Sequence, residues 1–565
     1  MAIEVHVPTI GNVKLKEDVD FIARGGQANI YRHSNYAFKI YHDKKDMIHP
    51  DKVKELVRID DKNVLKPVDT IYNNKKVPIG YVMDFVGGGY PLCKFFTKTF
   101  KNNNNVSPND IADLTTSIQK TVGSIHSKDF LIVDLNEMNI MIDDKFKVPV
   151  FLDVDSYQTP SFPATALMES IRDSLVKKNN FTQESDWYAW AIITFQMYVG
   201  LHPYKGKHPD YKPKDWRKRM DDGVSVFDSK ATMPPSCNDF SVIPKRHLDW
   251  YRDIFLNNNR SVPPYADSTI PVAVTGRAVT IIRKSENFDT NEALRVPESI
   301  KRVYVDFGVI YSLTGKGVYK GTQKIWDESA ILGSSWHLVF VNNSPLLIVR
   351  DSMGIIHIKN PDGSLVDSAP ADEVMYRDGR LYSIYANQVF EHHFDKMGLR
   401  IVHHKKRITQ VIPNQSKVYE GLIMQRGAHR TIMAIPFDKG SCAVLVVPEI
   451  NDCRIVDAKG EGNFVVVVTV KDGIYSRIIF KFNNDFSSYQ IRRIDDIEMS
   501  EINFTVLPGG ICILMPSDDK IEVFSDLEKL KEVDNPPFDS SMKLFSTTKG
   551  VHFIDEEHVF HTTMK

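Results

Sequence analysis

The stretch IHSKDFLIVDLNEMNIMID, residues 125–143, decides how the first half of the chain is interpreted. It leaves a segment with helical periodicity, passes through a turn, and ends in the apolar run 140–142. Between the turn and this run lie Asp134 and, five positions later, Asn139. A carboxylate and an amide at this spacing occur by chance in many chains, so their meaning depends on the neighbouring segments.

A further aspartate, Asp153, ends the next apolar run in VPVFLDVDSYQ (148–158). Together the two stretches resemble the catalytic segments of protein kinases, in which an HRDxxxxN loop precedes a strand and the DFG aspartate. The resemblance implies that Asp134 orients the substrate hydroxyl or accepts its proton, and that Asn139 supports catalysis as a metal ligand. Asp153 would bind the same Mg²⁺ (or Mn²⁺) ion at the phosphates of ATP.

The segment FIARGGQANIY (21–31) resembles the glycine-rich loop between two kinase strands. Backbone without a bulky side chain can approach phosphate groups closely, whereas the alanine methyl groups should stiffen this loop or lift it slightly. The small residues that we expect against the nucleotide are Ala23, Gly25, Gly26 and Ala28.

Lys39 lies in the middle of the apolar run YAFKIY (36–41). Burying a lysine is costly unless it is paired, which favours the catalytic, phosphate-binding lysine of kinases over a solvated edge residue. The resemblance implies a partner from the next helix, DKVKELVRI (51–59), where Glu55 is the best-placed carboxylate. An exposed position on that helix is the alternative for Glu55.

The run IGYVMDFVGGG (79–89) resembles the strand that leads into the adenine-binding segment of kinases. Met83 falls at the gatekeeper position, and the residues after it would offer backbone groups to the base. The predicted adenine contacts are Met83, Asp84, Phe85 and Val86. An ordinary buried strand that ends in a glycine turn is the alternative for this segment.

Two segments predict long helices in the same half of the chain. Residues 109–127 place apolar side chains at helical intervals, with an Asn or Asp as the candidate cap. Residues 185–199 are nearly apolar all round and predict a buried helix capped by Ser185 or Asp186. The second helix resembles the kinase F helix, which implies that Asp186 binds backbone amides of the loop that holds Asp134.

Several residues depart from the common kinase pattern. The HRD histidine and arginine are Ile132 and Val133, and the lysine two positions after the catalytic aspartate is Asn136. Asp155 stands in place of the DFG glycine, where it either approaches the metal or caps the turn. With its small-residue loop, the chain resembles the atypical bacterial and phage protein kinases, which often carry an appended domain.

The resemblance implies an ATP-dependent serine/threonine protein kinase that transfers phosphate with Mg²⁺ and autophosphorylates. One alternative is a pseudokinase scaffold, a binding protein that acts through the second half of the chain. Another is a small-molecule kinase, against which the full length of the segment 156–185 argues.

We expect a multidomain protein with an α+β bilobal kinase-like domain at 1–262, a linker at 263–271 and an all-β propeller at 272–565. Seven similar units follow the linker at the spacing of four-stranded blades, and the segment 272–284 is available to complete the last one. They begin at Val303, Leu338, Val374, Gly421, Phe464, Phe504 and Lys543. Irregular strands of one or two sandwiches are the alternative. The propeller is expected to recruit a protein substrate or partner.

Composition favours a soluble cytoplasmic protein. The formal net charge is −1, so the charge balance indicates neither nucleic acid nor an anionic membrane as a partner. The 5 cysteines are widely separated and form no CxxC pair, which favours reduced thiols. No apolar stretch is long enough to predict a membrane-spanning helix.

Overall fold

The computed structural model describes residues 2–266 and 285–565, apart from residues 332, 334, 399, 428, 429 and 499. The chain divides into two compact units. The first comprises Met1–Arg277 with Val470–Tyr475 and Asp496–Met499, and the second comprises Ala278–Thr469, Ser476–Asp495 and Ser500–Lys565.

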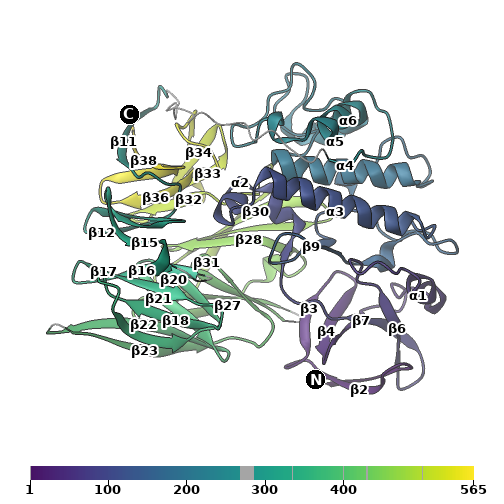
Figure 1. The fold of residues 1–565 in the computed structure, drawn as a ribbon, viewed down its shortest axis with the longest axis horizontal. Helices are drawn as coiled ribbons and strands as arrows, with labels where there is room; N and C mark the ends of the chain where they lie inside the picture. The colour runs from purple at the N-terminus through teal and green to yellow at the C-terminus, as the bar shows by residue number, and fades with distance from the viewer. Residues whose placement is uncertain are drawn as a thin grey trace. The chain divides into compact units, whose positions relative to one another are not determined.

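A seven-stranded antiparallel sheet begins the first unit, with the strand order β2-β1-β6-β7-β5-β4-β3 (Figure 1). Its strands are β1 (Ala2–Val7), β2 (Gly11–Lys16), β3 (Phe21–Arg24), β4 (Ala28–His33), β5 (Tyr36–Tyr41), β6 (Pro67–Asn73) and β7 (Pro78–Asp84). Lys39 pairs with Ile30 of β4 on one side and with Tyr81 of β7 on the other. The sheet therefore holds the backbone of Lys39 from both edges.

The rest of the first unit is mainly helical, with one small sheet in the order β10-β9-β8. The three strands are β8 (Tyr90–Pro91), β9 (Ile140–Ile142) and β10 (Pro149–Phe151). The α-helices are α1 (Pro50–Leu56), α2 (Lys98–Asn103), α3 (Pro108–His126), α4 (Gln183–Val199), α5 (Trp216–Asp221) and α6 (Lys245–Leu256). Short 3₁₀ turns are η1 (Leu92–Phe96), η2 (Val154–Ser156), η3 (Glu169–Ile171), η4 (Pro213–Asp215) and η5 (Phe240–Val242).

Both predicted long helices form, but their caps differ from the prediction. Helix α3 is capped by Ser107, whose Oγ accepts from the backbone N–H of Asp110 at 3.2 Å. Helix α4 begins after Thr182, and Ser185 already lies inside its first turn, where its Oγ accepts from the Thr182 N–H at 3.1 Å. Ser185 and Asp186 are thus helical residues and not caps, which leaves the Asp186 carboxylate available for another partner.

Helix α4 is buried nearly all round, as predicted. Trp190 is fully buried in its middle and packs edge-on against Trp187 and Trp250, with ring centroids 6.3 and 5.5 Å apart. Aromatic pairs of this geometry add to the apolar area that they bury. The helix is therefore the core of the helical part and a rigid support for whatever its first turn holds.

The described part of the second unit contains seven four-stranded antiparallel sheets (Figure 1). Sheets two to four are β12 (Ile300–Asp306), β13 (Val309–Thr314), β14 (Gly317–Lys320) and β15 (Gln323–Asp327); β16 (Ser335–Val341), β17 (Ser344–Arg350), β18 (Ile355–Lys359) and β19 (Leu365–Pro370); and β20 (Glu373–Arg377), β21 (Arg380–Tyr385), β22 (Gln388–Met397) and β23 (Arg400–Gln410). Sheets five to seven are β24 (Ser416–Tyr419), β25 (Leu422–Arg426), β26 (Thr431–Phe437) and β27 (Ser441–Val446); β28 (Arg454–Glu461), β29 (Phe464–Lys471), β30 (Ile474–Phe482) and β31 (Tyr489–Asp495); and β32 (Phe504–Leu507), β33 (Ile511–Ser517), β34 (Lys520–Asp526) and β35 (Lys529–Asp534). Two further 3₁₀ turns in this unit are η6 (Glu328–Ile331) and η7 (Pro448–Ile450).

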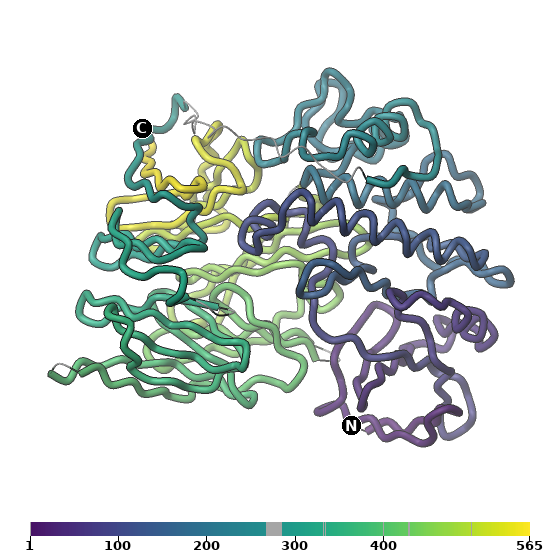
Figure 2. Tube along the Cα trace, viewed as in Figure 1, coloured from purple at the N-terminus to yellow at the C-terminus, as the bar shows by residue number. Residues whose placement is uncertain are grey.

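The first sheet joins the two ends of the second unit. Its strand order is β11-β38-β37-β36, with β11 (Phe288–Arg295), β36 (Lys543–Thr547), β37 (Gly550–Asp555) and β38 (His558–Met564). The chain trace shows β11 running beside the last strand before the C-terminus (Figure 2). The segment 272–284, proposed from sequence to complete this sheet, lies outside the described residues, and the strand that pairs with β38 is β11.

Each predicted unit corresponds to one sheet, but two of the predicted units start at the second strand of their sheet and not at the first. The units placed at Gly421 and Phe464 lack their first strands, β24 and β28. The sequences of these strands, SKVY and RIVDAKGE, are short or charged and do not alternate clearly between apolar and polar residues. Period-two alternation was therefore too weak a signal to find them.

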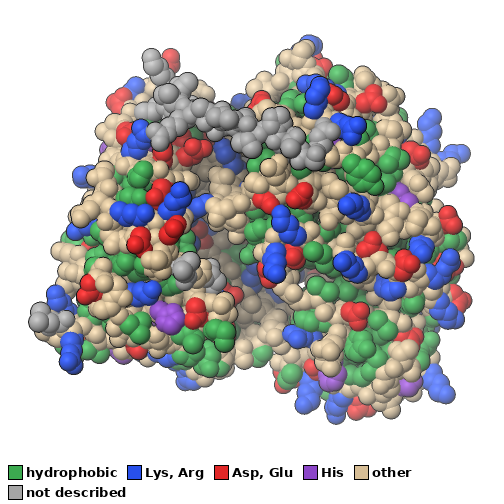
Figure 3. Space-filling view, in the orientation of Figure 1, with side chains coloured by type: hydrophobic (Ala, Val, Ile, Leu, Met, Phe, Trp, Pro, Cys, Tyr) green, Lys and Arg blue, Asp and Glu red, His purple; other side chains and the backbone are tan. Residues whose placement is uncertain are grey.

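Among the described residues, no helix is long and apolar enough to cross a membrane. Lysine, arginine, aspartate and glutamate side chains are interspersed over the face shown in Figure 3.

Candidate active site

The predicted glycine-rich loop is the tight turn between β3 and β4. The N–H of Gly25 donates to the carbonyl of Ala28 at 2.8 Å, which closes the turn. Gly26 is exposed at its tip, and a Cβ added there would meet no atom within 4 Å. Ala23 is exposed, whereas Ala28 is buried, so the Ala28 methyl packs inward and does not lift the loop as expected.

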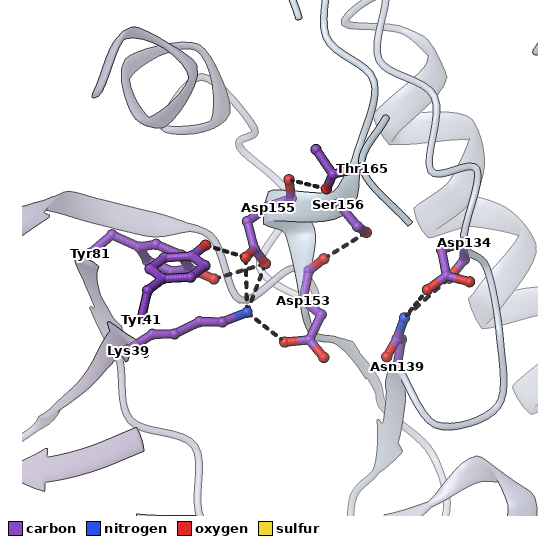
Figure 4. A network of polar contacts seen from close by, with 9 residues as sticks. All are labelled: Lys39, Tyr41, Tyr81, Asp134, Asn139, Asp153, Asp155, Ser156 and Thr165. Atoms are coloured by element: carbon purple, nitrogen blue, oxygen red, sulfur yellow. Dashed lines mark hydrogen bonds and ion pairs between the residues drawn. The ribbon is translucent and has the colours of Figure 1, made fainter. Parts of the chain in front are cut away.

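Lys39 is buried in β5 and pairs with two carboxylates (Figure 4). Its Nζ lies 3.0 Å from Asp153 Oδ1 and 2.9 Å from each oxygen of Asp155. Burial by itself lowers the pKa of Lys39, but the two carboxylates outweigh it and raise this pKa above its usual value. The lysine is therefore held as a cation beside Asp153.

The expected pair between Lys39 and Glu55 is not the one that the structure contains. The Glu55 carboxylate instead accepts from the backbone N–H of Ser161 at 3.4 Å. The polar residue that α1 buries is Lys52, whose Nζ donates to the carbonyls of Asp155 at 2.8 Å and Pro163 at 3.2 Å. Because α1 turns Lys52 inward, Glu55 faces the segment after η2 and not the strand that carries Lys39.

The residues of the predicted catalytic loop lie close together. Asn139 Nδ2 donates to Asp134 Oδ2 at 3.2 Å (Figure 4). The N–H of Met168 donates to Asp134 Oδ1 at 2.7 Å. Burial raises the pKa of Asp134 above its usual value, although hydrogen bonds from Asn136, Met168 and Asn139 oppose the shift. Both oxygens of the candidate base thus already accept hydrogen bonds.

The backbone before Asp134 is held by Asp186, as the sequence predicted. Asp186 accepts from the N–H of Ile132 at 2.7 Å, from that of Val133 at 2.8 Å and from Nε2 of His126 at 2.9 Å. Asp186 is fully buried at the start of α4, the rigid helix of the core. Asp186 therefore anchors the backbone before Asp134, even though Ile132 and Val133 replace the histidine and arginine of the common motif.

The residues expected to bind a metal ion have suitable chemistry. Asn139 uses its amide nitrogen on Asp134, which leaves its amide oxygen as the atom that can act as a ligand. Leu152 N donates to Asn139 O at 2.8 Å, so the residue before Asp153 lies beside Asn139. Within the described chain, no group of three or more His, Cys, Asp or Glu side chains could hold a metal alone. Phosphate oxygens would have to complete the shell, as they do for Mg²⁺ at nucleotide sites.

The predicted adenine-binding residues lie at the end of β7 and just after it. Met83 is half-buried and pairs with Ala37 of β5 and Pro67 of β6, whereas Asp84 is exposed and Val86 is 48% exposed. The N–H of Phe85 donates to the carbonyl of Asn35 at 2.8 Å. In this structure that group is therefore not available to a base, and Asp84 and Val86 are the remaining candidates.

Sequence reasoning missed the groups that surround Lys39. Tyr41 and Tyr81 donate to Asp155, and Lys52 fills the inner side of α1. Two signals were present in the sequence: a lysine on the apolar side of the 51–59 helix, and an aspartate where the DFG glycine is expected. The contact between Met168 and Asp134 had no signal, because it uses only a backbone N–H.

Comparison with known proteins identifies a protein kinase-like domain in the first half of the chain. Residues 29–242 match the family model of the protein kinase domain. The chain is 24% identical to ribosomal protein S6 kinase alpha-3 of Mus musculus over 131 residues, which are 22% of this chain and 17% of that protein. It is 20% identical to a probable serine/threonine-protein kinase of Dictyostelium discoideum over 146 residues, 25% of this chain and 11% of that protein. The chain thus matches less than a fifth of the length of these curated relatives.

Proposed function

We propose that the chain is an ATP- and Mg²⁺-dependent serine/threonine protein kinase that also phosphorylates itself. The observation that carries the proposal is the grouping of Lys39 with Asp153 and of Asp134 with Asn139 in a domain that matches the protein kinase model. These are the cation, the metal ligands and the carboxylate that phosphoryl transfer requires. The similarity to serine/threonine kinases supports the choice of hydroxyl substrate.

Each residue then has one task. Gly25 and Gly26 present backbone to the phosphates, and Lys39 neutralises their charge from within the sheet. Asn139 and Asp153 would hold Mg²⁺, which stabilises the charge that develops on the transferring phosphoryl group. Asp134 orients the substrate hydroxyl and takes its proton as the oxygen attacks. The Met168 N–H occupies one acceptor site of Asp134 Oδ1, so a substrate hydroxyl would have to share this oxygen or displace the N–H.

We also propose that the seven sheets of the second unit are the blades of a propeller that binds a protein substrate or partner. Each sheet has four antiparallel strands, the size of a blade. The first strands of successive sheets lie against each other, β20 with β24, β24 with β28, and β32 with β36. Pairing of β11 with β38 ties the start of this unit to its end, which is how a ring of blades is closed.

Purified protein incubated with γ-labelled ATP and Mg²⁺ tests the catalytic proposal. We expect label on the protein itself, phosphosites on Ser or Thr by mass spectrometry, and loss of both in Asp134→Ala and Asp153→Ala. Label that persists in both variants would show that another activity produced it. Absence of label in the wild type, with Mg²⁺ and Mn²⁺ and with protein substrates present, would contradict the proposal.

A pseudokinase that binds nucleotide without transfer is the second candidate. The contact of the Met168 N–H with Asp134 favours it, because the base is engaged, and so does the replacement of the loop lysine by Asn136. This candidate predicts that ATP with Mg²⁺ raises the melting temperature while no phosphate is transferred to protein. The proposed kinase predicts both the shift and the transfer.

A further inference from the structure

Asp155 lies at the centre of a buried cluster of donors. Lys39 Nζ contacts both of its oxygens at 2.9 Å, Tyr81 Oη donates to Oδ1 at 3.1 Å, and Tyr41 Oη donates to Oδ2 (Figure 4). The residue is only 5% exposed. A buried carboxylate is tolerated when donors satisfy it, and here three side chains do so. The position of this carboxylate is therefore fixed.

The partners of Asp155 come from the sheet and not from helix α1. Lys39 and Tyr41 belong to β5, and Tyr81 belongs to the adjacent strand β7. Because β4 and β7 hold β5 on both sides, the Lys39–Asp155 contact joins a rigid strand to the turn that also carries Asp153. The same turn thus fixes Lys39, which would contact the phosphates, and Asp153, which would bind the metal.

Helix α1 contributes a cation where kinases usually contribute a glutamate. Lys52 is 2% exposed and donates to the backbone carbonyl of Asp155, so two lysines flank one aspartate. A second buried cation beside Lys39 requires a carboxylate between them, because unpaired like charges in a buried site repel strongly. Asp155 meets this requirement, whereas Glu55 is half-buried and accepts from the backbone N–H of Ser161.

Neither role considered for Asp155 from the sequence fits these contacts. Its two carboxylate oxygens accept from Lys39, Tyr41 and Tyr81, so a metal ion would have to displace these donors. The N–H of Ser156 in the following turn donates to the carbonyl of Asp153 at 3.2 Å and not to the Asp155 side chain. Asp155 is thus neither a metal ligand nor a turn cap in this arrangement.

We infer that Asp155 is the positioning residue for Lys39 and replaces the helix glutamate that does this in other kinases; the inference rests on the proposed function. Its consequence is that the lysine stays in place whatever position α1 adopts. Movement of α1 would act on this site through Lys52 and the backbone of Asp155.

Kinetics and binding test the inference in the full-length protein. Asp155→Asn keeps the shape of the side chain and removes its charge. We expect turnover with a protein substrate to fall about 10- to 100-fold, as for a misplaced catalytic group, with little change in KM for that substrate. Lys39→Met should cause a similar loss, and the double variant should lose no more than either single variant, because the two residues act as one unit. Multiplied losses in the double variant would overturn the inference.

Competitive acetylation of lysines, read by mass spectrometry, tests the same contact without phosphoryl transfer. Lys39 should react faster with acetic anhydride in Asp155→Asn than in the wild type, because it loses a charged partner. Asp51→Asn, an exposed change on α1, is the matched control. Unchanged reactivity of Lys39 in Asp155→Asn, or a rise in Glu55→Gln instead, would overturn the inference. A rise in Asp155→Asn in a protein that transfers no phosphate would support the inference while the proposed function fails.

A second variant tests the inference if Asp155→Asn does not fold. Tyr41→Phe with Tyr81→Phe removes two donors to Asp155 and leaves both charges in place. We expect Lys39 acetylation to rise in the same direction by a smaller factor, and turnover to fall several-fold. Wild-type values for both measurements in this folded variant would count against the inference.

Discussion

The carboxylate of Asp186 accepts a hydrogen bond from the N–H of Val133 at 2.8 Å, and Val133 has a φ of 63°. A β-branched residue in the left-handed region is strained by about 1–2 kcal/mol. The strain persists because Asp186 also accepts from the N–H of Ile132, which fixes two successive amides. Since Asp134 follows directly, this arrangement sets the direction in which the candidate base points.

Asp186→Asn should destabilise the first unit and lower activity together. Asparagine can accept from one amide, but its NH₂ group then faces another donor inside the core. We expect a loss of about 3 kcal/mol in the free energy of unfolding, from the loss of charged, buried hydrogen bonds, and at least a tenfold loss of turnover. Urea unfolding followed by tryptophan fluorescence measures the first quantity.

Glu184→Gln is the matched control for Asp186→Asn. It removes a carboxylate from the same helical turn, but Glu184 is exposed. We expect a change no larger than the helix-dipole effect of about 1 kcal/mol and unchanged turnover. Equal losses in the two variants would mean that charge at the start of α4, and not the contact with Val133, accounts for the effect.

Lys52 should make the stability of the first unit depend on pH in the alkaline range. Desolvation lowers the pKa of Lys52 from 10.5 to about 8, so the folded state releases this proton before the unfolded state does. The unfolded chain then binds more protons between these values, and stability rises as pH increases from about 8 to 10.5. The full effect is about 3 kcal/mol for a shift of this size.

Lys52→Met should remove that rise in stability with pH. Urea unfolding midpoints at pH 7.5 and pH 10, each within about one unit of one of the two pKa values, would measure it. Lys54→Met is the control, because Lys54 is an exposed lysine on the same helix. Tyrosines and cysteines titrate equally in all three proteins, so only the difference between them is informative. A wild-type pH slope in Lys52→Met would contradict the assignment.

Sequence patterns located the main groups of the site but not their pairing. Asp134, Asn139 and Asp153 follow from spacing along one loop and two short strands, so their proximity could be predicted. The partner of Lys39 depends on how α1 is rotated about its axis, and Lys52 and Glu55 differ by less than one turn of that helix. The resemblance to kinases points to Glu55, whereas the burial of Lys52 decides the rotation. The predictions of the helix caps were wrong for a related reason, since several Ser, Asn and Asp residues near each helix start could each serve as the N-cap.

The ion pair between Arg260 and Asp173 should be a major support of the segment 156–185. Arg260 Nε lies 2.7 Å from Asp173 Oδ2, its Nη2 lies 2.8 Å from Oδ1, and its guanidinium stacks 4.1 Å from the Tyr188 ring. Both side chains are at most 10% exposed. Arg260→Ala leaves a buried carboxylate without its partner, which costs about 3–5 kcal/mol.

Thermal melting with limited proteolysis of the segment 156–185 would measure this loss. Lys245→Ala is the comparison, because it removes an exposed ion pair with Asp249 that should contribute less than about 1 kcal/mol. Arg260→Lys should fall between the two, since lysine keeps the charge but not the two parallel hydrogen bonds. A stability of Arg260→Ala equal to that of Lys245→Ala would refute the prediction.

Met168→Pro should raise phosphoryl transfer several-fold, if the Met168 N–H keeps substrate from Asp134. Proline lacks the N–H that donates to Asp134 Oδ1, and the φ of Met168, −79°, is one that proline adopts. Met168→Ala retains the N–H and removes only the side chain, so it should keep the wild-type rate. Initial rates with a protein substrate, at ATP concentrations well above KM, compare the three proteins. A fall in the proline variant alone would show that this hydrogen bond orients the base for catalysis and does not block it.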